Sequence, residues 1–149
     1  MLAKDIMRKD VVTLRPLMTL REAGAVLAER GITGAPVIDR RGEIMGVVSQ
    51  SDIVRCGAGR DKAGLPLFYS DDDDSPVEAF SRSEFDVLRV VDVMTNHVIS
   101  AEEEAPVEEL IATMLRSGVH RVVITRKGKL AGIVTTMDIL RILPGAPLR

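Results

Sequence analysis

Asp52 and Asp138 are the side chains whose type and spacing best suit chemistry. Each stands three residues after a hydroxyl side chain, Ser49 or Thr135. This is the spacing of a capping box, in which the acid satisfies backbone N–H groups at the start of a helix. The same carboxylate could instead extend past the helix end and accept hydrogen bonds from a ligand. Spacing alone favours the capping interpretation, and the ligand-binding interpretation stays open.

Both aspartates lie in a block of sequence that occurs twice, 86 residues apart. The first copy, GEIMGVVSQSDIVR, spans residues 42–55, and the second, GKLAGIVTTMDILR, spans residues 128–141. In each copy two glycines four residues apart precede a short apolar run, the hydroxyl residue, the Asp and an Arg. This order predicts a strand that runs into a capped helix. A repeat of this length indicates internal duplication of the chain.

The duplication extends further towards the N-terminus of each copy. AKDIMRKDVVT at residues 3–13 matches VVDVMTNHVIS at residues 90–100 with an offset of 87. We expect each of these leading segments to be extended and to end in a short strand.

A helix is predicted after each leading segment. In the first copy, a capping box at Thr19 and Glu22 predicts a helix that ends at Gly31. In the second copy, the corresponding helix is expected to close at Gly118. The acidic triplet at residues 102–104 is predicted to complement the dipole of that helix rather than to bind a metal ion.

The predicted order in each copy is strand, helix, strand, strand, helix. Strands at 35–38 and 122–125 follow the helices, and each returns through a hairpin into the block with the Asp. A right-handed crossover makes the first two strands parallel and leaves the third antiparallel. A three-stranded mixed sheet with helices on one side leaves much apolar surface uncovered. We expect the two copies to bury this surface against each other about a pseudo-two-fold axis.

The predicted fold class is therefore α/β, with four segments. They are a first repeat at 1–56, a linker at 57–88, a second repeat at 89–143 and a tail at 144–149.

The linker holds all four aromatic residues of the chain, which we predict to pin it over apolar surface. They are Phe68, Tyr69, Phe80 and Phe85. The acidic run 71–74 lacks the ligand spacing and the glycine of a calcium loop and is predicted to be a solvated loop. The residues 75–78 are typical of a capped helix start.

Composition limits the classes of function. The chain has 149 residues, of which 46% are apolar, and a net charge of −2, which gives no general attraction to nucleic acid or anionic membranes. Cys56 is the only cysteine, and we expect it to be a buried thiol at a helix end. No apolar run is long enough for a membrane span, and the N-terminus lacks the apolar core of a signal peptide. These features predict a soluble cytoplasmic protein.

The repeated blocks resemble a known family. The pattern DIM-x-x-x-VVT, helix, GIT-x-x-PVID and RRGE-x-x-GVVS-x-x-D is similar to the CBS domain, the module named after cystathionine β-synthase. The second copy, DVM followed by VHRVVITRKGKLAGIVTTMDIL, resembles another. The resemblance covers residues 3–55 and 90–142. It implies a pair of CBS domains packed into a disc with two clefts, which commonly binds AMP, ADP, ATP or S-adenosylmethionine and usually forms a homodimer.

The resemblance also implies which residues bind the ligand. In the family the Asp of the [ST]xxD motif holds the ribose hydroxyls, so Asp52 and Asp138 become ligand-binding candidates. The hydroxyl side chains of the same motifs are expected to face the ligand, and the residues before the second strand to line the base or reach the phosphates. These further candidates are Ser49, Thr135, Thr136, Ile32, Thr33, Gly34, Val119, His120 and Arg121.

Family analogy combines the base segment of one copy with the Asp of the other, so that Ile32 and Thr33 would share a ligand with Asp138. His120 and Arg121 offer donors for phosphate, whereas the corresponding residues of the first copy carry no charge. We therefore expect two unequal sites, with the phosphate preference set by the second copy. The alternative is that Arg121 is an exposed junction residue.

We compare three candidate functions. The first is a non-catalytic sensor that binds an adenosine-containing ligand, requires no cofactor and acts on an unidentified protein target, because no nucleophile–base pair, metal-ligand spacing or phosphate loop is visible. The second is a protein–protein interaction scaffold with vestigial ligand sites. The third, nucleic-acid binding, is opposed by the net charge, the acidic run and the scarcity of aromatic residues.

Overall fold

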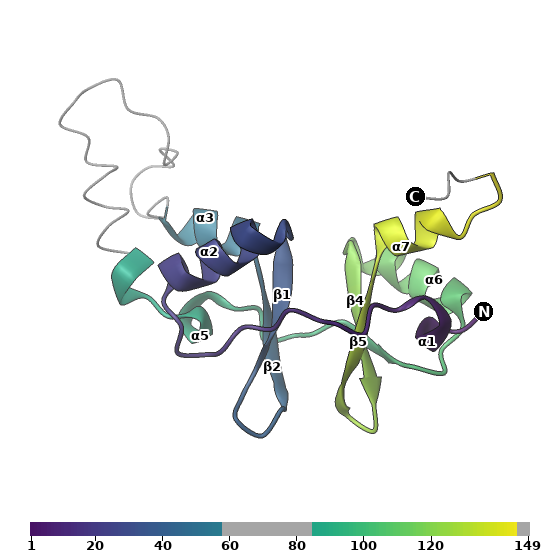
Figure 1. Cartoon of the computed structure of the whole chain (residues 1–149), viewed down its shortest axis with the longest axis horizontal. Helices are drawn as coiled ribbons and strands as arrows, with labels where there is room; N and C mark the ends of the chain where they lie inside the picture. Colours follow the sequence, from purple (N-terminus) through teal and green to yellow (C-terminus); the bar gives the residue numbers. More distant parts are fainter. Residues whose placement is uncertain (58–84, 146–149) are drawn as a thin grey trace. The chain divides into compact units, whose positions relative to one another are not determined.

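The computed structural model describes residues 1–57 and 85–145 and divides into two compact units (Figure 1). We call Met1–Val12, Arg40–Ile44 and Val98–Arg149 the Asp138 unit. We call Thr13–Asp39 and Met45–His97 the Asp52 unit. Each sequence repeat therefore supplies most of one unit and gives its leading segment to the other.

The Asp52 unit pairs two strands and packs helices against them. Its elements are α2 (Leu20–Arg30), β1 (Gly34–Ile38), β2 (Ile44–Ser49), α3 (Gln50–Gly57) and α5 (Val90–Val93). The Oγ1 of Thr19 accepts a hydrogen bond from the backbone N–H of Glu22 at 3.1 Å, and Gly31 ends α2 at φ 63°. Both the predicted cap and the predicted glycine stop are confirmed.

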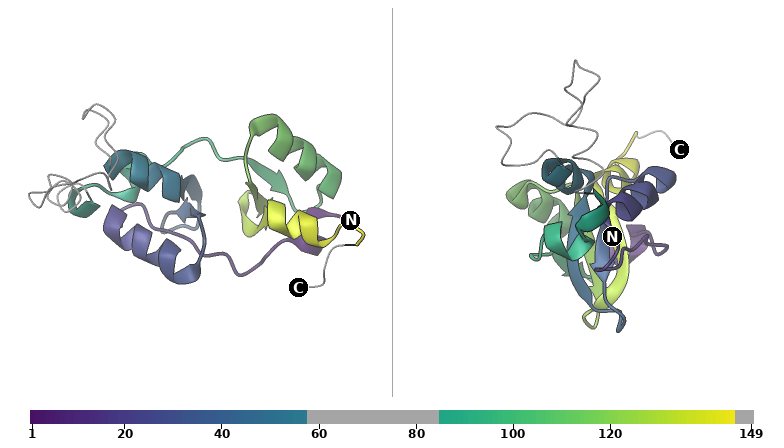
Figure 2. Two further views of the ribbon diagram at one scale, coloured as in Figure 1. Left: turned by 90° about the horizontal axis from the view of Figure 1, so that it is seen from above. Right: turned by 90° about the vertical axis from the view of Figure 1, so that its left-hand side faces the viewer.

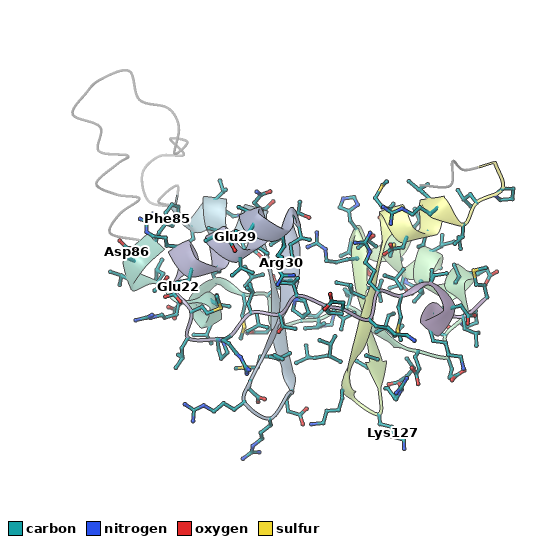
Figure 3. All side chains as sticks on the ribbon, viewed as in Figure 1. Glu22, Glu29, Arg30, Phe85, Asp86 and Lys127 are labelled. Atoms are coloured by element: carbon teal, nitrogen blue, oxygen red, sulfur yellow. The ribbon has the colours of Figure 1, made fainter. Side chains whose placement is uncertain are left out.

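The Asp138 unit holds a three-stranded mixed sheet. Its elements are α1 (Ala3–Ile6), β3 (Ser100–Glu102), α6 (Val107–Ser117), β4 (Arg121–Arg126), β5 (Lys129–Thr135) and α7 (Thr136–Arg141). β3 pairs parallel with β4, and β4 pairs antiparallel with β5, as the sequence predicts. Lys127 and Gly128 connect β4 to β5 with φ of 51° and 80°, a two-residue turn of the type that matches strand twist. Lys127 lies at the tip of this hairpin (Figure 3).

The prediction of a first strand is wrong for the Asp52 unit, where Leu14 alone bridges Val37. In the Asp138 unit the backbone N–H of Glu103 donates to the carbonyl of Thr125 at 3.0 Å and extends the ladder. Pro16 occupies the matching position 87 residues earlier. Because proline has no N–H, it cannot make that bond, and the pairing stops after one bridge.

The leading segments are not extended at their start, contrary to the prediction, because each opens with one helical turn. The carboxylate of Asp5 accepts a hydrogen bond from the backbone N–H of Leu2 at 2.7 Å, and Asp92 accepts one from Arg89 at 2.8 Å. These short bonds stabilise the turns α1 and α5 at their first residues. In the left view of Figure 2 the purple helix α1 lies with the elements of the second repeat.

Glycine in β2 and β5 makes room for the leading segments. A Cβ added at Gly46 would lie 2.6 Å from the carbonyl oxygen of Thr95, and one added at Gly132 would lie 2.6 Å from the sulfur of Met7. It would also lie 2.9 Å from the carbonyl oxygen of Arg8. The second glycine of each repeated block is thus needed for close approach of another backbone.

Each unit has its own aliphatic core. Leu14, Leu20, Leu27, Val37, Val48 and Val90 are buried in the Asp52 unit, and Ala3, Leu110, Val122, Ile124 and Val134 in the Asp138 unit. Val90 and Ala3 belong to leading segments. Their burial therefore stabilises the packing of each leading segment in the unit that the other repeat mainly forms.

Of the linker aromatics, Phe85 packs against the core of the Asp52 unit, as predicted, and lies in a short helical turn (Figure 3). The predictions for Phe68, Tyr69, Phe80, the acidic run 71–74 and the helix start at 75–78 lie outside the described residues.

The acidic triplet does not complement the dipole of α6, which begins only at Val107. Instead, each carboxylate has a different partner. Glu102 accepts from the hydroxyl of Thr125 at 2.9 Å, Glu103 pairs with Arg126 at 2.6 Å, and Glu104 pairs with Lys4 at 2.8 Å. The pair with Lys4 ties α1 to the Asp138 unit.

Candidate functional site

Asp52 caps the helix on which it lies and keeps part of its carboxylate open. Its Oδ2 accepts from the backbone N–H of Ser49 at 2.8 Å, while its own N–H donates to the Oγ of Ser49 at 3.2 Å. Among the described residues, Oδ1 has only the guanidinium of Arg55 nearby, at 3.6 Å, which is an ion pair and not a hydrogen bond. Capping therefore uses one oxygen and leaves the other able to accept.

A recess of about 160 Å³ lies within the Asp52 unit. It is lined by Asp52, Arg55, Cys56, Asp92 and Val93, from α3 and α5. Sites for whole drug-sized ligands are typically 300–1,000 Å³, so this recess suits a sugar-sized group. The buried thiol of Cys56 lies at the end of α3, as the sequence predicts.

Asp138 also caps its helix, but its second oxygen is occupied. Oδ2 accepts from the backbone N–H and the hydroxyl of Thr135 at 2.8 and 2.9 Å. Oδ1 accepts from Nε of Arg8 at 3.1 Å and from Nη1 of Arg141 at 3.2 Å. A carboxylate has about four acceptor positions, and four donors fill them here. The side chain is only 6% exposed.

The residues before the second strand lie beside the Asp motif of the same repeat. In the Asp52 unit, the backbone N–H of Gln50 donates to the carbonyl of Thr33 at 2.8 Å. In the Asp138 unit, the N–H and hydroxyl of Thr136 donate to the carbonyl of His120 at 3.0 and 3.2 Å. The side chains of Thr33 and His120 are exposed, whereas Arg121 is half-buried at the start of β4.

The remaining predicted residues differ in accessibility. Ile32, Ser49, Val119 and Thr135 are half-buried, and Gly34 is buried. The predicted sharing of one ligand by Ile32, Thr33 and Asp138, and the phosphate preference of the second copy, stay predictions.

Sequence reasoning missed the leading segments as part of the site. Arg8 contacts Asp138, and Asp92 lines the recess beside Asp52. The available signal was the repeated Asp at positions 5 and 92, together with the second glycine of each block, which indicates the close approach of another segment.

Within residues 1–57 and 85–145, no group of three or more His, Cys, Asp or Glu side chains is able to hold a metal ion. In the same ranges, no helix has the length and apolarity that crossing a membrane requires.

The chain is similar in sequence and in fold to several known proteins. An uncharacterized protein of Methanocaldococcus jannaschii is 30% identical over 96% of this chain and 91% of its own length. The CBS domain pair of protein MJ0100, solved with 5′-methylthioadenosine and S-adenosyl-L-methionine, has a TM-score of 0.75 at 24% identity and covers 99% of this chain and 98% of its own. The structure of CBSX2 with AMP has a TM-score of 0.71 at 23% identity and covers 94% and 93%.

The chain is shorter than several relatives and spans 61% of a 28% identical protein of Methanopyrus kandleri. The model of the CBS domain matches residues 3–59 and 90–145, which are most of the chain. The two repeats that carry Asp52 and Asp138 are thus a tandem pair, and the chain belongs to the CBS-domain family.

Proposed function

We propose that this chain is a non-catalytic sensor module that binds an adenosine-containing ligand, namely AMP, ADP, ATP or S-adenosylmethionine. The observation that carries the proposal is that Asp52, which keeps one carboxylate oxygen open, lines a sugar-sized recess. CBS pairs of the same fold solved with AMP and with S-adenosylmethionine support this choice of ligand class.

The chemistry of the Asp52 site suits a ribose. A diol presents two adjacent donors, and one carboxylate oxygen has lone pairs for both. Hydrogen bonds to a charged acceptor contribute about 1.5–3 kcal/mol each. Because Oδ2 is already held by the backbone of Ser49, the orientation of the carboxylate is fixed before a ligand arrives.

Calorimetry with AMP, ATP and S-adenosylmethionine tests the function directly. Binding of at least one of the three supports the proposal. The proposal is rejected if none of the three binds to protein that has been confirmed free of carried-over ligand.

The role of Asp52 needs a sharper test, in which adenosine and 2′,3′-dideoxyadenosine are compared on wild type and Asp52→Asn. We expect the diol to improve affinity about tenfold or more in wild type and not in the variant. Asparagine preserves the cap, so loss of fold does not confuse the result. Asp86→Asn, which removes a surface carboxylate paired with Arg21 in the same unit, is the matched control and should keep the preference for the diol.

One observation favours the scaffold alternative for the second repeat. The carboxylate of Asp138 is fully engaged by its own cap and two arginines. If both sites were vestigial, nucleotide would not raise the thermal stability of wild type, Asp52→Asn or Asp138→Asn. A true site at a hundredfold excess of ligand over Kd adds about 2.7 kcal/mol to the free energy of unfolding.

The homodimer, the protein target and the cytoplasmic location stay predictions from the sequence. Light scattering of the full chain, with and without nucleotide, tests the first of them. A mass of one chain under both conditions would contradict the homodimer.

A further inference from the structure

Four positions correspond between the two units, namely the central aspartate and three further residues. The pairs are Asp5 with Asp92, Arg8 with Thr95, Asp52 with Asp138, and Arg55 with Arg141. Three of the pairs have identical residues, and only Arg8 and Thr95 differ. The four positions therefore carry one more positive charge in the Asp138 unit than in the Asp52 unit.

The backbone of the differing position is the same in both units. The N–H and carbonyl of Arg8 pair with those of Ile133 at 2.9 and 3.1 Å. Thr95 pairs in the same way with Val47 at 2.9 and 3.0 Å. Strand pairing therefore fixes where the side chain starts, and the contrast between the units comes from the side chain alone.

Arg8 closes one side of the central carboxylate of the Asp138 unit. Its Nε lies 3.1 Å from Oδ1 of Asp138, which corresponds to the open oxygen of Asp52 and also accepts from Nη1 of Arg141 at 3.2 Å. A ribose can use this oxygen only after a guanidinium leaves it. The side chain of Arg8 is 52% exposed, so it is free to turn towards a group in solvent.

We propose that Arg8 is a specificity-determining residue, which makes the Asp138 site select nucleosides that carry a phosphate. This inference rests on the proposed function. The phosphate takes the guanidinium of Arg8, for which its geometry is well matched, and the release of Arg8 frees one acceptor position of Oδ1 for a ribose hydroxyl, while Arg141 keeps the other. The Asp52 site, with Thr95 in the matching place, accepts the nucleoside without a phosphate.

The test compares adenosine and AMP by calorimetry on the full chain. Asp52→Asn isolates the Asp138 site, and we expect AMP to bind there at least tenfold more tightly than adenosine. Adding Arg8→Thr should bring the ratio of the two affinities close to one. Lys9→Thr removes one positive charge from the next position and, as the matched control, should leave the ratio largely unchanged.

The reciprocal exchange keeps the inference falsifiable if Arg8→Thr disturbs the fold. In an Asp138→Asn background, Thr95→Arg should weaken adenosine binding at the Asp52 site about tenfold and produce a preference for AMP.

The possible failures are distinguishable. Binding of both probes with a ratio that neither exchange changes overturns the role of Arg8 and leaves the proposed function standing. If wild type and all variants bind neither probe, this inference is overturned, and the proposed function is overturned with it when ATP and S-adenosylmethionine also fail to bind.

Discussion

The Asp52 and Asp138 units share one plan but use their central carboxylates differently. In both, one oxygen of the aspartate caps the final helix. In the Asp52 unit the other oxygen accepts no hydrogen bond from the described residues and the aspartate lines a recess, whereas in the Asp138 unit the other oxygen accepts from two arginines. Of the three positions compared beside each aspartate, two are identical, so the contrast between the carboxylates coincides with the replacement of Arg8 by Thr95 in a leading segment.

The largest expected effect tests the feature that both units share, the close approach of a leading segment. Gly46→Ala and Gly132→Ala should each lower the free energy of unfolding by about 2–3 kcal/mol, because the new Cβ meets backbone or sulfur atoms at 2.6 Å. Gly24→Ala is the matched control. It lies in α2 with nothing within 4 Å of the added Cβ, so it should stabilise by about 0.5–1 kcal/mol.

Urea unfolding measures these changes. If the two strand glycines behaved like Gly24, the packing of leading segments against β2 and β5 would be contradicted.

A second prediction separates the two carboxylates in the absence of ligand. Asp52→Ala removes a cap and should cost about 1 kcal/mol. Asp138→Ala removes a cap and two charged hydrogen bonds, and should cost about 2 kcal/mol, since the half-exposed arginines regain water. Chemical denaturation of both variants checks the order. Equal losses would mean that the contacts of Arg8 and Arg141 contribute nothing to stability.

The smallest expected effect is a dependence of the free energy of unfolding on pH, and it arises only in the Asp138 unit. The guanidinium of Arg126, which hydrogen-bonds to Glu103, lowers the pKa of that carboxyl below its ordinary 4.5. Its contribution to stability is therefore present above this value and is lost as the pH falls through the folded pKa. The difference in unfolding free energy between wild type and Glu103→Gln should be constant above about pH 5 and shrink below it.

The pH dependence expected from Lys4 has the opposite sign to that from Glu103. The hydrogen bond to Glu104 raises its pKa above 10.5, so its contribution is lost only as the pH rises through that range. A difference for Glu103→Gln that grew on acidification would contradict the assigned direction.

Local signals in the sequence predicted much of the fold. The capping boxes at Thr19, Ser49 and Thr135 and the stops at Gly31 and Gly118 act through neighbouring residues, so short patterns are sufficient. The family resemblance, carried by two ordered copies of one motif, is confirmed.

The exchange of leading segments could not be predicted in the same way. Gly46 and Gly132 lie inside β2 and β5, and their role is to admit a segment far away in sequence, which no local pattern identifies. The difference between Arg8 and Thr95 is visible in the alignment of the repeats. Its meaning depends on strand pairing that brings position 8 to Asp138, 130 residues away.

The most direct measurement is the stoichiometry of adenosine binding by calorimetry to wild type, Asp52→Asn and Asp138→Asn. The account predicts one strong site per chain, which is lost in Asp52→Asn and kept in Asp138→Asn. Binding that survives Asp52→Asn and disappears in Asp138→Asn would contradict it.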